Sequence, residues 1–225
     1  MLIPQSPNNK NNSSGLNIMS NFKLMKFDTY KTITESAQGE IFKDKNSKFY
    51  GFAFPVTTED QIRAHLDRLK KEHYTARHWC YAYQIGTETI RHRVNDDGEP
   101  NNSAGMPIYG QIQSYELTNV LIVVIRYYGG VKLGVGGLIN AYKTAAHLSI
   151  ENAQVVEKTI NTIFQLKFEY KNMSKVMRIL KENQVEVINQ RLEHSCLLEI
   201  SVRKGNASKV FELFNAFFGV EIREL

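Results

Sequence analysis

Apolar and polar positions over the first 153 residues follow patterns that predict strands separated by two amphipathic helices. Runs rich in aromatic and β-branched residues predict strands at residues 30–34, 40–43, 48–54, 79–85, 89–94 and 120–126. The last run, Val-Leu-Ile-Val-Val-Ile-Arg, is continuously apolar, which is typical of a central strand buried on both faces. The first three strands are expected to form an antiparallel meander.

Two segments of the same region repeat their apolar residues at helical spacing. The first follows Thr58, which forms a capping-box pattern with Gln61, and it continues to about Glu72. The second spans residues 138–153 and is expected to begin just after a cluster of glycines. Residues 95–105 are polar and contain glycine and proline, which indicates a loop.

From residue 156 onward the pattern becomes β-α-β-β-α-β. The predicted strands and helices lie at residues 159–170, 173–181, 185–190, 195–202, 207–217 and 219–223. Asn172 and Asn206 are expected to cap the two helices. This order is that of the ferredoxin-like split βαβ unit. We therefore predict an α+β protein with domains at residues 28–155 and 156–225.

The start of the chain has a different composition. Residues 4–20 are mostly Asn, Ser, Gln and Pro, so this segment cannot bury enough apolar surface to offset its ordering entropy. We predict that residues 1–27 form a disordered leader. Met19 or Met25 is an alternative natural start, in which case the leader has no functional role.

The amino-acid composition limits the expected type of partner, the state of the cysteines and the location of the protein. The net charge of +5 and pI of about 9.1 favour an anionic partner without identifying nucleic acid. Cys80 and Cys196 lie far apart outside any metal-ligand spacing, which indicates reduced thiols. The chain shows neither a membrane-spanning apolar run nor a signal peptide, so a cytoplasmic location is expected.

Three segments are rich in Gly, Arg, His and acidic residues. They lie at strand ends or in loops, where functional sites are usually found. They are Ala76-Arg77-His78 leading into Cys80-Tyr81-Ala82-Tyr83, Asp96-Asp97-Gly98-Glu99-Pro100 with Ser103-Ala104-Gly105-Met106-Pro107, and Arg126-Tyr127-Tyr128-Gly129-Gly130 with Lys132-Leu133-Gly134-Val135-Gly136-Gly137-Leu138.

The third segment has the chemistry of an anion site. Its glycines leave backbone N–H groups unobstructed, the following helix adds a partial positive charge, and basic side chains add full charges. Together with the first segment, it provides a candidate phosphate or nucleic-acid site at Arg77, His78, Arg126, Lys132, Gly129, Gly130, Gly134, Gly136 and Gly137. Alternatively, the glycines only permit a tight strand-to-helix turn. The pattern is neither a Walker loop nor a dinucleotide fingerprint.

The acidic loop has three alternative interpretations. Asp96, Asp97 and Glu99 could hold a divalent metal or act as acid and base, although their spacing is not that of an EF-hand. The same residue types are also common in tight turns. They could instead orient Arg77 or Arg126 by ion pairing. We predict no cofactor and no metal.

Further side chains have both a functional and a structural interpretation. His78 could contact phosphate or cap a strand end. Arg91 and Arg93 share one face of a strand, where they could meet phosphates or face solvent. Four tyrosines could stack on bases or lie in the core, namely Tyr81, Tyr83, Tyr127 and Tyr128.

The three segments, in this order and spacing, resemble the signature of the YigZ/IMPACT family. The resemblance covers residues 29–153, and the tail resembles the extra C-terminal domain of bacterial members. Two departures are visible. Asn101, Asn102 and Ser103 stand where the family usually has Gly-Thr before Ala-Gly, which could alter the loop, and Tyr128 replaces a common Phe.

The resemblance implies that the first domain has the fold of the second domain of a small-subunit ribosomal protein and of elongation factor G domain four. The tail is similar to domain five of that factor. Bacterial members are accordingly expected to bind RNA or the ribosome, and eukaryotic members to act through protein partners in translational control. An argument from fold is associational.

Three functions remain open on the sequence. The first is a noncatalytic translation-linked regulator that binds RNA or the ribosome through the anion site. The second is an enzyme or ligand-binding protein for a phosphorylated small molecule, with the acidic loop opposite the glycines. The third is a protein-interaction module in translational control. The absence of a recognisable nucleophile motif or cofactor fingerprint argues against an enzyme without excluding one.

Overall fold

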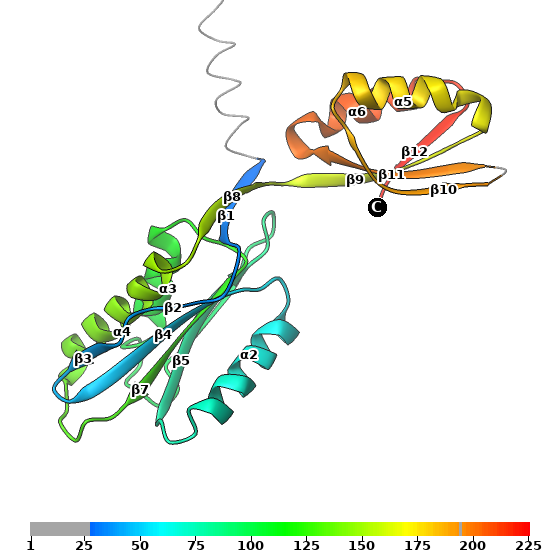
Figure 1. The fold of residues 1–225 in the computed structure, drawn as a ribbon. Coiled ribbons are helices and arrows are strands. Elements are labelled where there is room, and N and C mark those ends of the chain that lie inside the picture. Colours follow the sequence, from blue (N-terminus) through cyan, green and yellow to red (C-terminus); the bar gives the residue numbers. More distant parts are fainter. Residues whose placement is uncertain (1–27, 194) are drawn as a thin grey trace, which may run out of the picture. The chain divides into compact units, whose positions relative to one another are not determined.

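The computed structural model describes residues 28–193 and 195–225, so the predicted leader lies outside the described residues. Internal contacts divide the chain into a larger unit, Tyr30–Lys158, and a smaller unit, Thr159–Leu225 together with Asp28 and Thr29 (Figure 1). This division follows Lys158, whereas the predicted boundary followed Val155. No described helix has the length and apolar character needed to cross a membrane.

A six-stranded antiparallel sheet forms the centre of the larger unit. Its strands are β2 (Ala37–Gln38), β3 (Phe42–Asp44), β4 (Ser47–Pro55), β5 (His78–Ile85), β6 (Arg91–Asn95) and β7 (Val120–Tyr127). The order is β2-β4-β7-β5-β6, with β3 also paired to β4. The apolar run in β7 is central and buried, as its pattern predicts.

The first predicted strand does not join this sheet. β1 (Thr29–Ile33) pairs instead with β8 (Val155–Thr159) in a separate two-stranded sheet, so the expected three-stranded meander is wrong at its first member. The backbone N–H of Thr34 also donates to the carbonyl of Gln154 at 3.2 Å. This pairing joins residues more than a hundred positions apart, so the local alternation of apolar and polar residues cannot predict it.

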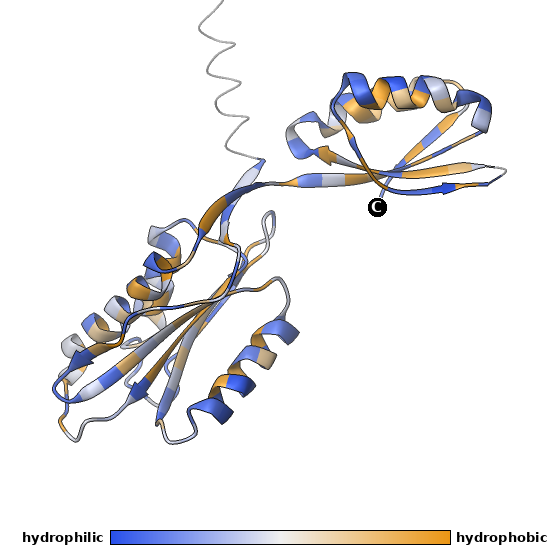
Figure 2. Cartoon of the chain, viewed as in Figure 1, coloured by the Kyte–Doolittle hydropathy of each residue, from blue (hydrophilic) through white to orange (hydrophobic). Residues whose placement is uncertain are grey.

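Helices cover both faces of the larger sheet. α2 (Glu59–Glu72) packs on one face, and α3 (Gly105–Ser114) and α4 (Gly134–Glu151) pack on the other (Figure 1). Figure 2 shows α2 as mostly hydrophilic with an interrupted apolar stripe. The predicted capping box is confirmed, because the N–H of Gln61 donates to the Thr58 hydroxyl and the Gln61 side chain accepts from the Thr58 N–H.

Two helix starts differ from the sequence expectation. The sequence does not predict α3, because its first turns contain Gly105, Pro107 and Gly110, and Ala104 at its N-cap offers no side-chain acceptor. α4 begins at Gly134, so the glycines lie within its first turn rather than in a preceding loop. Gly134 suits this start because its φ of 77° favours glycine.

The smaller unit has the predicted order β-α-β-β-α-β. Its elements are β9 (Asn161–Phe168), α5 (Met173–Glu182), β10 (Glu186–Leu192), β11 (Cys196–Arg203), α6 (Ala207–Asn215) and β12 (Val220–Glu224). The sheet order is β10-β11-β9-β12 with antiparallel neighbours. α5 and α6 cover one face of the sheet (Figure 1), and the core between them includes Leu166, Leu198 and Phe214.

The two predicted asparagine caps are only partly correct. Asn172 and Asn206 occupy the N-cap positions of α5 and α6, but neither side chain makes a capping hydrogen bond. Each asparagine ends a short 3-10 turn and has helical rather than extended backbone angles. This conformation differs from the extended one in which a cap side chain reaches the first free N–H groups.

Candidate anion site at one end of the larger sheet

Strand pairing brings the first and third segments together. Arg126, near the end of β7, is paired across the sheet with His78 of β5 and with Phe49 of β4. The N–H of Arg77 donates to the carbonyl of Arg126 at 3.3 Å. Residues 129–133 then leave the same end of the sheet to enter α4. The candidate residues of both segments therefore gather at this end.

Arg126 itself lies in the interior, where it is 4% exposed. Its Nη1 donates to Oε1 of Glu99 at 2.6 Å, and its Nη2 donates to the hydroxyl of Ser47 at 3.3 Å. The guanidinium also lies over the ring of Phe49, 5.5 Å from its centroid. This corrects the expected role of Arg126: because its charge is compensated below the surface, it serves as an internal partner of Glu99 and not as a surface cation.

Glu99 connects three elements. Besides Arg126, its Oε1 accepts the hydroxyl proton of Tyr142 on α4 at 2.8 Å, and Nε2 of His78 lies 3.9 Å away. Burial, together with the Cys80 thiol and the Glu99 carboxylate, raises the pKa of Tyr142, so this hydroxyl stays protonated and continues to donate. Of the alternatives for the acidic loop, Glu99 fits the one in which an acid orients an arginine.

The other two carboxylates of the loop are turned toward the backbone. Asp96 accepts the N–H groups of Asn102, Ala104 and Gly105 at 2.8–2.9 Å, so it caps the start of α3 from eight residues upstream. Asp97 accepts the N–H of Trp79 at 2.7 Å. Within residues 28–193 and 195–225, no three His, Cys, Asp or Glu side chains are placed to hold a metal ion. Asp96 and Asp97 thus serve turn and capping chemistry.

His78 and Cys80 are also held by this loop. Nδ1 of His78 lies 2.8 Å from the carbonyl of Asp97, which matches the strand-end interpretation of this histidine. The thiol of Cys80 donates to the carbonyl of Asp96 at 3.0 Å. Burial raises the pKa of Cys80 well above its ordinary value, so the thiolate is not formed near neutral pH and the side chain is not a nucleophile.

The exposed part of the site consists of Arg77, Tyr128 and Lys132. The guanidinium of Arg77 lies 5.8 Å from the ring centroid of Tyr128, whose ring also lies 5.2 Å from the guanidinium of Arg126. Arg77 and Lys132 are exposed, and no carboxylate in the described part of the chain forms an ion pair with either. Their charges are available to an anion.

The other predicted side chains occupy different settings. Tyr81 and Tyr127 are half-buried and Tyr83 is buried, so these three rings pack in the core on the α2 face rather than offering a stacking surface. Arg91 and Arg93 are exposed on β6, where Arg91 lies 3.5 Å from Glu59. Tyr74, just after α2, is a further exposed aromatic that no motif contains; it is 79% exposed and precedes Arg77 by three residues.

Glycine occurs for different structural reasons at the five glycine positions of the candidate site. Gly129 lies against the backbone of Asn46 and has no room for a Cβ atom. Gly130 and Gly134 adopt φ values of 86° and 77°, which favour glycine. A Cβ on Gly137 would lie 3.0 Å from the side chain of Leu133. Only Gly136 among them has both open space and an ordinary φ, so the fold does not require glycine there.

The helix start is displaced from the buried network. Tyr142, which contacts Glu99, comes eight residues after Gly134, a separation of about 12 Å along α4 at ~1.5 Å per residue. The free N–H groups at the start of α4 are therefore grouped with exposed Lys132 and not with Glu99. The buried Arg126–Glu99 pair lies beneath the surface of the site.

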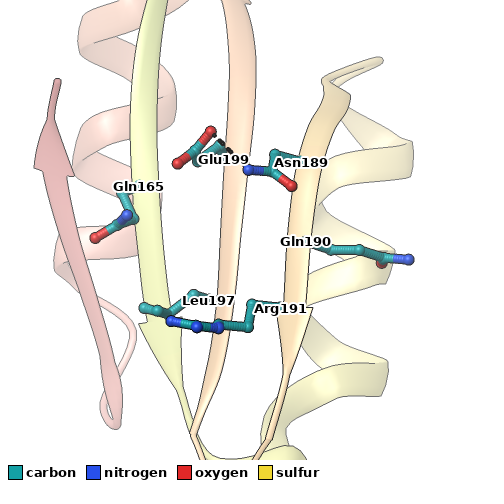
Figure 3. A pocket seen from close by; sticks show the side chains of 6 residues that line it. All are labelled: Gln165, Asn189, Gln190, Arg191, Leu197 and Glu199. Atoms are coloured by element: carbon teal, nitrogen blue, oxygen red, sulfur yellow. Dashed lines mark hydrogen bonds between the residues drawn. The ribbon is translucent and has the colours of Figure 1, made fainter.

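A hollow of about 360 Å³ occurs elsewhere, on the uncovered sheet face of the smaller unit (Figure 3). It is lined by Gln165, Asn189, Gln190, Arg191, Leu197 and Glu199. The amide of Asn189 donates to Glu199 at 3.2 Å, so two of these polar groups satisfy each other (Figure 3). No sequence motif marks this surface, because its residues come from three strands, β9, β10 and β11.

Comparison with known proteins agrees with the sequence resemblance. Residues 45–150 match the model of the Impact N-terminal domain. The IMPACT family member YvyE of Bacillus subtilis is 35% identical over 156 residues, which cover 69% of this chain and 71% of that protein. The chain belongs to the IMPACT family. A member of the same family from Haemophilus influenzae is 31% identical over 174 residues, covering 76% of this chain and 82% of that protein.

A solved structure of a hypothetical protein shares the fold. It superposes with a TM-score of 0.66 at 24% sequence identity and covers 88% of this chain and 98% of the other. At this identity the likeness shows an α+β fold of the kind found in the family, and it says nothing of activity.

Proposed function

We propose that this IMPACT-family protein is a translation-linked regulator that binds RNA, free or within the ribosome, at the end of the larger sheet. In this proposal Arg77 and Lys132 contact phosphates, Tyr128 supports Arg77, and the first N–H groups of α4 receive a phosphate oxygen. Arg126 and Glu99 hold the strands and α4 in register beneath this surface. The link to translation rests on the family resemblance.

The observation that carries the proposal is Gly136. Within a helix a glycine costs up to about 1 kcal/mol relative to alanine, and at Gly136 neither a contact nor a positive φ requires it. Close approach of a ligand to the backbone is a physical reason for glycine at such an open position. Exposed Lys132 and the partial positive charge of the helix start favour an anion as that ligand.

The fold assignments belong to the same proposal. We infer that the smaller unit is ferredoxin-like and resembles domain five of elongation factor G, which its element order and the strand order β10-β11-β9-β12 support. We infer that the larger unit resembles the second domain of a small-subunit ribosomal protein. Both resemblances are to ribosome-linked proteins, which supports the proposal by association of fold.

The test is salt-dependent binding of a labelled single-stranded RNA, followed by fluorescence anisotropy. The double variant Arg77→Ala/Lys132→Ala should bind more weakly, and the slope of log K against log salt should fall by about 1.4, at ~0.7 per lost phosphate contact. The matched control Arg63→Ala/Lys70→Ala removes the same charge from the exposed face of α2 and should retain the wild-type slope.

Two results would overturn the proposal. One is wild-type protein that shows no salt-sensitive binding. The other is an equal loss of affinity in both double variants, because net charge alone would then explain the effect.

A further inference from the structure

The smaller unit exposes two large aromatic side chains at one end of its sheet. Tyr170 is 70% exposed and Phe218 is 97% exposed. Their segments are held side by side, since Phe168 at the end of β9 pairs with Val220 at the start of β12. The amide of Asn172 also donates to the carbonyl of Gly219 at 3.2 Å. The two exposed rings are therefore carried by adjacent segments at the same end of the sheet, which we call the aromatic tip.

A stripe of basic side chains begins at this tip. Lys171, in the 3-10 turn before α5, and Lys175, Arg178 and Lys181 of α5 are all exposed and follow one another at spacings of three or four residues. This spacing places the three lysine and arginine side chains of α5 on one face of the helix. The stripe extends over about 15 Å, at ~1.5 Å of helix rise per residue. Residues 169–182 contain these four cations and only two carboxylates, Glu169 and Glu182.

The carboxylates do not block the stripe. Glu169 lies 2.8 Å from Lys171, and Glu182 lies 3.7 Å from Arg178, but all four side chains are between 63% and 71% exposed. Ion pairs this exposed contribute no more than about 1 kcal/mol, and a polyanion can displace them. Lys175 has an aromatic neighbour instead, with its Nζ 6.0 Å from the ring centroid of Phe217.

We propose that this end of the smaller unit binds single-stranded RNA, with unpaired bases stacked on Tyr170 and Phe218 and phosphates along the basic stripe of α5. An exposed ring can accept any base on its face, provided the base is not already covered within a duplex. Four cations beside the rings favour a polyanion over an apolar protein surface, which would leave those charges without partners. This surface lies in a different unit from the site at Arg77 and Lys132.

The first test compares the full chain with Tyr170→Ala/Phe218→Ala. Because both side chains are largely in solvent, the substitutions should not impair folding. The double variant should bind a single-stranded RNA at least about fivefold more weakly for each ring lost, and should bind the duplex of the same sequence as wild type does. The control Ile188→Ala removes an exposed apolar side chain of the same unit and should leave binding unchanged.

The second test uses Phe218→Trp, which keeps a stacking surface. This variant should bind single-stranded RNA as wild type does, and RNA should quench its added fluorescence beyond the change seen for native Trp79 in the larger unit. Unchanged affinity of the Tyr170→Ala/Phe218→Ala protein, or equal losses for single-stranded and duplex RNA, would overturn the inference. Loss of binding in Arg77→Ala/Lys132→Ala alone would overturn it while sustaining the first site.

Discussion

At the scale of single residues, two arginines of the site have opposite environments. Arg77 is exposed, whereas Arg126 is buried, and the side chains of Arg126 and its partner Glu99 are each 5% exposed. A buried ion pair is weak evidence for net stability, but removal of one partner leaves an uncompensated charge in the interior. The Arg126–Glu99 pair is therefore expected to be more sensitive to truncation than the surface pairs of this protein.

Glu99→Ala should reduce the free energy of unfolding of the larger unit by about 3–5 kcal/mol, because it leaves Arg126 buried without a counter-charge. The measurement is urea denaturation followed by circular dichroism. The control is Asp60→Ala, since Asp60 pairs with Arg63 at 3.3 Å on the surface, and its loss should cost at most about 1 kcal/mol. A midpoint shift for Glu99→Ala no larger than that of the control would contradict the assigned role.

At the scale of elements, α4 is held by close backbone approach. A Cβ atom on Gly51 of β4 would lie 2.1 Å from the carbonyl oxygen of Ala145 on α4, and one on Gly39 would lie 2.6 Å from the backbone of Ser149. These glycines allow the helix to pack directly on the strands. Gly136, at the free start of the same helix, meets nothing within 4 Å.

The contrast between two glycines gives a matched test. Gly51→Ala should destabilise the larger unit by about 1–3 kcal/mol, because backbone atoms of α4 must move to admit the methyl group. Gly136→Ala should stabilise it by about 0.5–1 kcal/mol through helix propensity, while weakening RNA binding. Both are measured from urea midpoints. Destabilisation by Gly136→Ala would show that the fold requires this glycine and would remove the main support for the first RNA site.

At the scale of the whole molecule, apolar side chains form separate cores in the two units. The clusters beneath α3 and α4 and beneath α2 contain residues of the larger unit, and the cluster beneath α5 and α6 contains residues of the smaller one. Units with separate cores can unfold as separate cooperative units.

Phe214→Ala should test this division, since Phe214 is fully buried in the smaller unit. The truncation should cost about 3–5 kcal/mol. Amide hydrogen exchange read by mass spectrometry should then show reduced protection in β9 and β11, with protection in β7 unchanged. Comparable loss of protection in β7 would mean that the two units unfold together.

Elements whose signals are local could be predicted from the sequence. α2, with its capping box, the apolar run of β7 and the order of the smaller unit all depend on residues within one element or its immediate flanks. The gathering of Arg77 and His78 near Arg126 also follows from their placement at strand ends. The capping role of Asp96 could not be predicted in this way, because Asp96 caps α3 from eight residues away.

The amino-acid sequence by itself determined the family, the type of most elements and the residues worth examining, because periodicity and motif spacing are recorded within short stretches of chain. Only the tertiary structure decided that β1 pairs with β8, that Arg126 is neutralised by Glu99, and that Gly136 meets open space. Strand partners, burial and charge compensation depend on residues tens of positions apart, whose proximity exists only after folding. The aromatic tip of Tyr170 and Phe218 belongs to this second group, since β9 and β12 meet only in the folded sheet.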